Sequence, residues 1–205
     1  MLRVLAVGPL AANCYVLADE NEALAVVIDP GADHEAIQSL LRQEELQLGA
    51  IVCTHGHYDH IGAIEELAKQ RQAPVFIHPL DAPMLSDAFA NLSATFDQQP
   101  QSLSIDWQPA RAGTDIRVGG VDLRVLDTPG HTPGGISLVV EGAVFCGDAL
   151  FAGSIGRTDL PGGDYATLIA SIKENLFALP DETIVYPGHG PATTIGIERV
   201  SNPYL

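Results

Sequence analysis

Three histidines and an aspartate lie within six residues of one another, directly after a short apolar run. The run covers residues 50–53, and the segment that follows it reads Thr54-His55-Gly56-His57-Tyr58-Asp59-His60. Imidazole nitrogens and carboxylate oxygens are the donors that zinc, iron and manganese accept in proteins. The apolar run predicts a buried strand, and the amphipathic pattern of residues 61–68 predicts a helix. The donors therefore lie on a strand-to-helix loop, where they can converge on a metal ion.

Three more donors follow the ends of predicted strands. His131 comes after the strand predicted over residues 121–127, Asp148 after residues 143–146, and His189 after residues 183–185. Glycines flank each of them, and glycine lets the backbone turn tightly beside a ligand. A single residue of this kind would more often be an ordinary loop residue. Donors at four strand ends together indicate one metal site at the edge of a sheet.

The rest of the chain alternates between strand-like and helix-like segments. Strands are predicted over residues 2–7, 13–17, 25–28 and 75–78, and helices over 35–43 and from about Pro83. After a long loop over residues 91–113, the second part repeats the plan, with strands over 115–118, 121–127, 136–140 and 143–146. A helix follows Asp164, a suitable N-cap, with Leu168, Ile172 and Leu176 on one face. Two β-rich halves with outer helices predict a four-layer αββα sandwich.

The donor pattern resembles the metallo-β-lactamase superfamily in order and spacing along the whole chain. Within that superfamily, the chain is similar to the small hydroxyacylglutathione hydrolase-like (glyoxalase II-like) branch. Residues 8–15, 147–151, 153–164 and 196–205 carry this second resemblance. It implies one α/β domain over residues 1–205, without the C-terminal helical domain of the full-length relatives.

The resemblance also implies a ligand set for two divalent metal ions. His55, His57 and His131 would hold one ion. Asp59, His60 and His189 would hold the other, and Asp148 would bridge the two ions. Asp59 and Asp148 are the candidate catalytic carboxylates. Zinc is the expected metal, with iron and manganese as alternatives, because nitrogen and oxygen ligands suit all three.

This set predicts a hydrolase that uses a metal-bound hydroxide, since a bound cation lowers the pKa of water towards ~7. A small-molecule thioester such as S-D-lactoylglutathione suits the site, because a thiolate leaves without a strong proton donor. Arg157 matches a basic residue that approaches the glutathione carboxylate in the related hydrolases, and guanidinium can bind a carboxylate through two hydrogen bonds. The alternative role for Arg157 is an ion pair with Asp159 or Asp164 that shapes its loop.

Other activities remain open at this point. A persulfide dioxygenase with one iron shares the His-x-His-x-Asp-His core and has a segment like Gly156-Arg157-Thr158-Asp159. A hydrolase of another ester, a lactone or a β-lactam would also use this site. A metal-binding structural protein is disfavoured, because the ligand set is complete and would leave an open metal position.

Composition restricts the partners and the compartment. The net charge is −16 with ten Lys and Arg residues, so we expect no nucleic-acid partner, since phosphate binding needs clustered basic side chains. The chain has no signal peptide pattern and no apolar stretch that would cross a bilayer, so we expect a cytoplasmic protein that does not bind membranes. Three widely spaced cysteines predict buried free thiols rather than disulfides. His34 and His78 are expected to be solvated surface residues.

Overall fold

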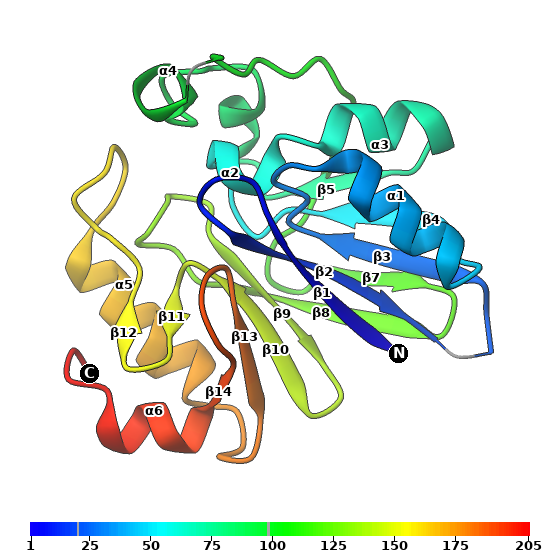
Figure 1. Cartoon of the computed structure of the whole chain (residues 1–205). Helices are drawn as coiled ribbons and strands as arrows, with labels where there is room; N and C mark the ends of the chain where they lie inside the picture. The colour runs from blue at the N-terminus through cyan, green and yellow to red at the C-terminus, as the bar shows by residue number, and fades with distance from the viewer. Residues whose placement is uncertain (20, 98) are drawn as a thin grey trace.

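Two six-stranded sheets pack face to face, and helices cover the outer face of each sheet (Figure 1). The structure is a computed structural model that describes residues 1–19, 21–97 and 99–205. Its layers run helix, sheet, sheet, helix. The predicted αββα sandwich is therefore confirmed.

The first sheet is built from the first half of the chain, with its strands in sequence order. The strands are β1 (Leu2–Val7), β2 (Ala12–Ala18), β3 (Leu24–Ile28), β4 (Gln47–Val52), β5 (Val75–Ile77) and β6 (Gln108–Pro109). β1, β2 and β3 pair antiparallel, whereas β3 to β6 pair parallel. The residues that follow β4 therefore leave the sheet at the carboxyl end of its parallel part, where α/β sheets commonly place their sites.

The second sheet is built from the second half of the chain. Its strands are β7 (Asp115–Val118), β8 (Val121–Asp127), β9 (Ile136–Val140), β10 (Ala143–Gly147), β13 (Ile184–Pro187) and β14 (Thr193–Thr194). β13 pairs parallel with β10, so the loops after these two strands emerge at the same edge. A separate hairpin, β11 (Leu150–Phe151) with β12 (Ser154–Ile155), lies between them in the sequence.

Helices of the first half are α1 (His34–Gln43), α2 (Tyr58–Ile61), α3 (Ile64–Arg71), the 3₁₀ turn η1 (Ala82–Leu85) and α4 (Ser93–Phe96). Those of the second half are α5 (Tyr165–Ser171), which continues as a π-helical turn (η2, Ile172–Leu176), and α6 (Ile195–Ser201). The predicted N-cap of α5 is confirmed, because the Asp164 side chain accepts a hydrogen bond from the Thr167 amide. Leu168, Ile172 and Leu176 are buried on the predicted face.

The alternation of side chains along the strands explains the layers. In β3, Ala25 and Val27 pack outward against α1 and α3, whereas Val26 and Ile28 pack inward between the two sheets. Successive residues of a strand point to opposite faces, so a strand buried on both sides is apolar throughout. A third core, which includes Leu168, lies between the second sheet and α5 and α6. The three hydrophobic cores thus fill the three spaces between four layers.

Several expectations need correction. The region 91–113 is not a plain loop, because it contains α4 and β6; residue 98 lies outside the described residues. The predicted loop of donors ends earlier than expected, since Asp59 and His60 lie on the short helix α2. His78 is not a solvated surface residue: its side chain is only 13% exposed and lies 3.9 Å from the Asp127 carboxylate.

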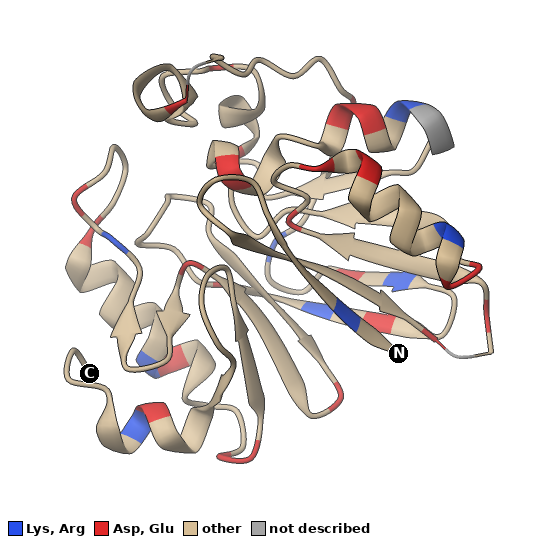
Figure 2. Ribbon diagram, viewed as in Figure 1, with Lys and Arg blue, Asp and Glu red and all other residues tan. Residues whose placement is uncertain are grey.

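Charged side chains are spread over separate elements. In Figure 2, the Lys and Arg residues are scattered over separate elements. Within the described part of the chain, we find no helix with the length and apolar character needed to span a bilayer.

Candidate metal centre

The seven predicted donors come together between the two sheets, at the ends of β4, β8, β10 and β13. Among the described residues, three groups of three have ligand atoms within 4.8 Å of one another: a first group of His55, His57 and His131, a second group of Asp59, His60 and His189, and a third set, Asp29, His55 and His60, that overlaps both. Asp148 lies between the groups. One of its carboxylate oxygens is 3.6 Å from His60 Nε2, and the other is 3.6 Å from His131 Nε2 and 3.7 Å from His189 Nε2.

The spacing within the groups is that of ligands around an ion. His57 Nδ1 and His131 Nε2 are 2.9 Å apart, and His60 Nε2 and His189 Nε2 are 3.3 Å apart. The carboxylate of Asp59 is 3.2 Å from His189 Nε2. Two donors at a tetrahedral angle around zinc, each bonded at about 2.0–2.1 Å, lie about 3.3 Å from each other.

Hydrogen bonds on the outer side of two rings fix which nitrogen faces the centre. His131 Nδ1 is 2.8 Å from the Arg157 carbonyl oxygen, which can only accept, so Nδ1 carries the hydrogen. His60 Nδ1 is 3.1 Å from the Asp29 carboxylate and donates in the same way. The Nε2 lone pair of each ring is therefore free to bind a metal, an arrangement typical of metal-binding histidines.

Asp29 is a buried residue that the sequence reading missed. Its carboxylate accepts hydrogen bonds from the Thr54 amide at 2.7 Å and from the Thr54 hydroxyl at 2.6 Å, as well as from His60. Because the Thr54 hydroxyl donates to Asp29, it must accept the 3.1 Å hydrogen bond from His55 Nδ1. Asp29 thereby orients His60 directly and His55 through Thr54. Asp29 precedes the Pro30-Gly31 turn at the end of β3, and that position after a strand was the available signal.

Asp81 is a second buried carboxylate that the sequence reading missed. It is fully buried and accepts hydrogen bonds from the Gly56 amide (3.1 Å), the Thr132 hydroxyl (2.7 Å) and the Gly134 amide (2.6 Å). Gly56 lies between His55 and His57, and the other two donors closely follow His131 in the sequence. Burial raises the pKa of Asp81, although the three hydrogen bonds oppose this effect. One carboxylate thus joins the loops that carry the whole first group.

The His189 loop is held from the other half of the molecule. The Asn13 side chain donates hydrogen bonds to the carbonyl oxygens of Pro187 at 3.0 Å and Gly190 at 2.9 Å. The Tyr15 hydroxyl donates to the Pro187 carbonyl at 2.6 Å, and the Asn13 amide donates to the Gly188 carbonyl at 2.7 Å. β2 therefore positions both sides of His189.

The tail of the chain holds the hairpin beside the centre. Glu198 on α6 is buried, and its carboxylate accepts hydrogen bonds from the Gly153 amide and the Thr193 hydroxyl. Asn202 donates one hydrogen bond to Glu198 and another to the Ser154 carbonyl. This network fixes the loop that leads to the Arg157 carbonyl and so to His131.

Unpartnered polar atoms show that the donor set fits metal ions. His55 Nε2 and Asp148 Oδ1 are buried and have no hydrogen-bond partner, which is costly unless a cation takes up their lone pairs. A side chain at Gly188 would place its Cβ 2.1 Å from Asp148 Oδ1, so glycine there leaves the carboxylate free.

The electrostatics of the rings support the same reading. Burial lowers the pKa of His55 and, to about 3, that of His57, so both rings are neutral at neutral pH. Burial also lowers the pKa of His60, but the carboxylates of Asp59, Asp148 and Asp29 outweigh it and raise the value to about 10. This side of the centre therefore favours positive charge, which bound cations would supply.

Arg157 contributes its backbone to the centre and turns its side chain to solvent. Its guanidinium is 62% exposed and donates two hydrogen bonds, of 2.9 Å and 2.8 Å, to Asp159. An ion pair with Asp159 is one of the two alternative roles that the sequence analysis gives for Arg157. The side chain still lines the cavity described next, so it can also reach a ligand there.

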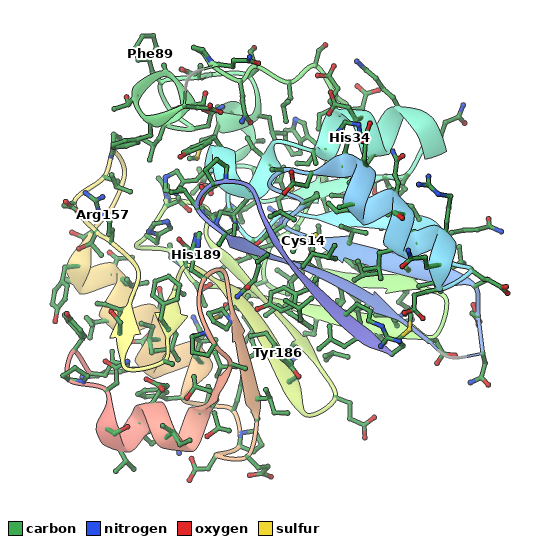
Figure 3. All side chains as sticks on the ribbon, viewed as in Figure 1. Cys14, His34, Phe89, Arg157, Tyr186 and His189 are labelled. Carbon is green, nitrogen blue, oxygen red and sulfur yellow. The ribbon has the colours of Figure 1, made fainter. Side chains whose placement is uncertain are left out.

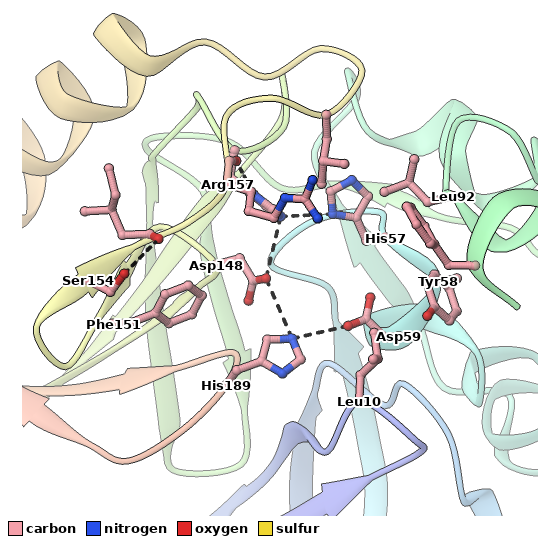
Figure 4. A pocket seen from close by; sticks show the side chains of 14 residues that line it. Leu10, His57, Tyr58, Asp59, Leu92, Asp148, Phe151, Ser154, Arg157 and His189 are labelled. Carbon is pink, nitrogen blue, oxygen red and sulfur yellow. Dashed lines mark hydrogen bonds and ion pairs between the residues drawn. The ribbon is translucent and has the colours of Figure 1, made fainter. Parts of the chain in front are cut away.

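A cavity of about 430 Å³ opens over the donors (Figure 4). His57, Asp59, His131, Asp148 and His189 form its polar floor. Figure 3 shows Arg157 and His189 on neighbouring loops on this side of the molecule. The three cysteines, Cys14, Cys53 and Cys146, are free and buried as predicted. Burial raises the pKa of Cys146 to about 12 and also raises those of Cys14 and Cys53, so all three are protonated thiols.

The chain is similar to known proteins over nearly its whole length. Residues 7–189 match the family model of the metallo-beta-lactamase superfamily. The probable metallo-hydrolase YqgX of Bacillus subtilis is 38% identical over 99% of this chain and 96% of its own length. The hydroxyacylglutathione hydrolase GloC of Haemophilus influenzae is 34% identical over 100% of this chain and 97% of its own length.

Solved structures share the fold over nearly the whole chain. BLEG-1, a B3 metallo-beta-lactamase, aligns with a TM-score of 0.95 at 39% identity and covers 100% of this chain and 99% of its own. TTHA1623, solved in a di-iron-bound form, gives a TM-score of 0.89 at 38% identity, covering 99% of this chain and 100% of its own. ETHE1 from Myxococcus xanthus gives 0.81 at 32% identity, covering 99% of this chain and 83% of its own.

Proposed function

The chain belongs to the metallo-beta-lactamase superfamily, and from this premise we propose that it is a metal-dependent hydrolase of thioesters such as S-D-lactoylglutathione. The observation that carries the proposal is the pair of donor groups on either side of Asp148, at the floor of an open cavity. A reacting carbonyl that enters the cavity meets both groups at once. The 34% identity to a hydroxyacylglutathione hydrolase supports the choice of thioester.

Each donor group would hold one divalent ion. His55, His57 and His131 form the first site, and Asp59, His60 and His189 form the second. Asp148 would contact both ions, because its two oxygens face the two groups. Zinc fits the tetrahedral spacing of the nitrogens, and iron is the alternative.

Divalent ions held at these sites would supply a bound water with a pKa of about 7 and a positive charge beside the carbonyl oxygen. The residues of the chain then have positioning roles. Asp59 and Asp148 supply negative charge to the centre. Asp29 keeps His60 in the metal-binding tautomer, and the Arg157 carbonyl does the same for His131. A thiolate leaving group needs no strong acid, which suits a cavity floor made of ligands.

Arg157 would bind a carboxylate at the far end of the substrate. Its guanidinium lines the cavity and is already arranged for a bidentate contact, which Asp159 occupies. A substrate carboxylate would replace Asp159 there. Since both side chains are exposed, the exchange costs little.

The proposal is tested by comparing bond classes. The zinc-loaded protein should release thiol from S-D-lactoylglutathione at least about tenfold faster, in kcat/KM, than it opens nitrocefin. BLEG-1 is named a β-lactamase, so the β-lactam is the appropriate competitor. A β-lactam rate equal to or above the thioester rate would sink the thioester proposal and leave a metallo-hydrolase of another bond.

The second candidate is a persulfide dioxygenase with one iron. The 32% identity to ETHE1 is the observation that keeps it. It requires oxygen, whereas thioester hydrolysis does not. Oxygen uptake on glutathione persulfide by the iron-loaded protein, with no thiol release from thioesters, would establish it.

A further inference from the structure

The walls of the cavity are apolar above the ring of donors. Leu10, in the turn between β1 and β2, faces it, and so do residues of three other segments: Leu92, Phe96, Phe151, Ile155 and Leu160. Several of these side chains are open to water, with Leu10 51% and Phe96 57% exposed. Apolar area that converges on a reaction centre from four segments is typical of a pocket that buries part of its ligand.

The polar groups on the walls do not match a highly charged ligand. Outside the donors, they are Tyr58, Ser154 and Arg157. Arg157 is the one cationic side chain of the lining, and it is paired with Asp159. Glutathione carries two carboxylates, so this wall can pair with one of them at most.

We propose that the cavity binds an apolar arm of the substrate in addition to the one carboxylate that Arg157 can pair with, so that lengthening this arm by methylene groups raises kcat/KM. The inference rests on the proposed thioesterase function and names the substrate class for that site. The occupant is the substrate itself, because the walls are continuous with the donors that would face the reacting carbonyl. A thioester has two arms, acyl and thiol, and either of them can carry the chain.

Two substrate series test the proposal on the zinc-loaded protein. In one, acetyl, butyryl, hexanoyl and octanoyl groups are joined to the same thiol, N-acetylcysteamine; in the other, acetyl is joined to ethane-, butane- and hexanethiol. Each buried methylene should raise kcat/KM about fourfold until the cavity is filled. The series that rises identifies the arm that enters.

Two phenylalanines provide a matched pair of variants. Phe96→Ala removes part of the wall and should reduce the gain per methylene in the rising series. Phe89→Ala is the control, since Phe89 is 77% exposed, does not line the cavity and points outward at the rim of the molecule (Figure 3). It should leave the gain unchanged.

The outcomes separate the inference from the function on which it rests. Measurable hydrolysis with no dependence on chain length in either series would overturn the apolar-arm proposal and leave the thioesterase proposal intact. Equal effects of the two alanine variants on the gain would overturn it as well. No hydrolysis of any thioester would instead overturn the proposed function.

Discussion

The two halves of the molecule supply the candidate ligands in different ways. The first half contributes four donors from one stretch, residues 55–60, which begins just after β4 and ends on α2. The second half contributes His131, Asp148 and His189 from three loops after β8, β10 and β13. The backbone fixes the first set locally. The second set takes its positions from contacts between segments that are far apart in the sequence.

The buried polar residues of the site make those long-range contacts. Asp81 and Thr132 are 51 residues apart, and Asn13 and Pro187 are 174 apart, yet each pair is hydrogen-bonded. Both contacts join the first half of the chain to a loop of the second. The arrangement of the centre therefore depends on residues outside the candidate ligand set. If this is right, changes in the connecting residues should weaken metal binding nearly as changes in ligands do.

The largest effect is expected where the two sets meet. Asp148→Ala removes the carboxylate that faces both groups, so metal content should fall below two ions per chain. Thioester hydrolysis should drop by more than about a hundredfold, the upper range for loss of an outer partner of a metal ligand. Elemental analysis and thiol release measure the two effects. Asp122→Ala, an exposed carboxylate on β8, is the control. Two retained ions with activity within tenfold of normal would contradict the bridging role.

The next largest effect is expected for the connection at Asp81. Asp81→Ala leaves three donors unsatisfied, so the free energy of unfolding should fall by about 3 kcal/mol or more. Metal affinity, measured by chelator competition, should fall about 10- to 100-fold. Asp81→Asn keeps one acceptor oxygen and should recover part of both losses, whereas the exposed Asp106→Ala should change neither. Normal metal affinity in a destabilised Asp81→Ala protein would make this residue purely structural.

A smaller effect is expected for Asn13→Ala. The variant removes two hydrogen bonds to the His189 loop, but the Tyr15 hydroxyl and the residue-13 amide keep theirs. Affinity for one of two ions should fall, by up to about tenfold. Metal titration followed by calorimetry resolves the two binding events, with the exposed Asn21→Ala as the control. A loss of metal affinity in Asn13→Ala as large as that in Asp81→Ala would contradict the smaller effect expected at Asn13.

How much of this was predictable depends on where the chemical signal lies. The donors were predictable because His and Asp follow apolar strands, and the layers were predictable because strand residues alternate between two cores. Asp29 and Asp81 were missed, since their partners are mainly backbone amides and hydroxyls brought close only by the fold. The Arg157 carbonyl has no sequence signal, because every residue has a carbonyl. α6 was missed because Ile197 and Val200 are exposed apolar residues that blur its pattern.

The smallest effect on metal binding is expected at the exposed Arg157–Asp159 pair, which belongs to neither connection. Arg157→Ala should raise KM for S-D-lactoylglutathione with kcat nearly unchanged, lowering kcat/KM about tenfold, because binding common to the ground and transition states is lost. Asp159→Ala frees the guanidinium and should lower KM by up to about fivefold. The backbone carbonyl that orients His131 stays in both variants. If both variants raise KM alike, the pair serves only to shape its loop.

The central claim is that the two halves jointly hold two metal ions at the floor of the cavity. Anomalous diffraction from crystals of the metal-loaded protein, recorded at the absorption edges of zinc and iron, tests it most directly. We expect two peaks about 3.5–4 Å apart, as in other two-metal hydrolytic sites. One should lie among His55, His57 and His131, the other beside Asp59 and His189, with the Asp148 carboxylate between them. A single peak confined to the donors of residues 55–60 would contradict joint binding of two ions by the two halves. An Asp148 carboxylate turned away from both ions would contradict it as well.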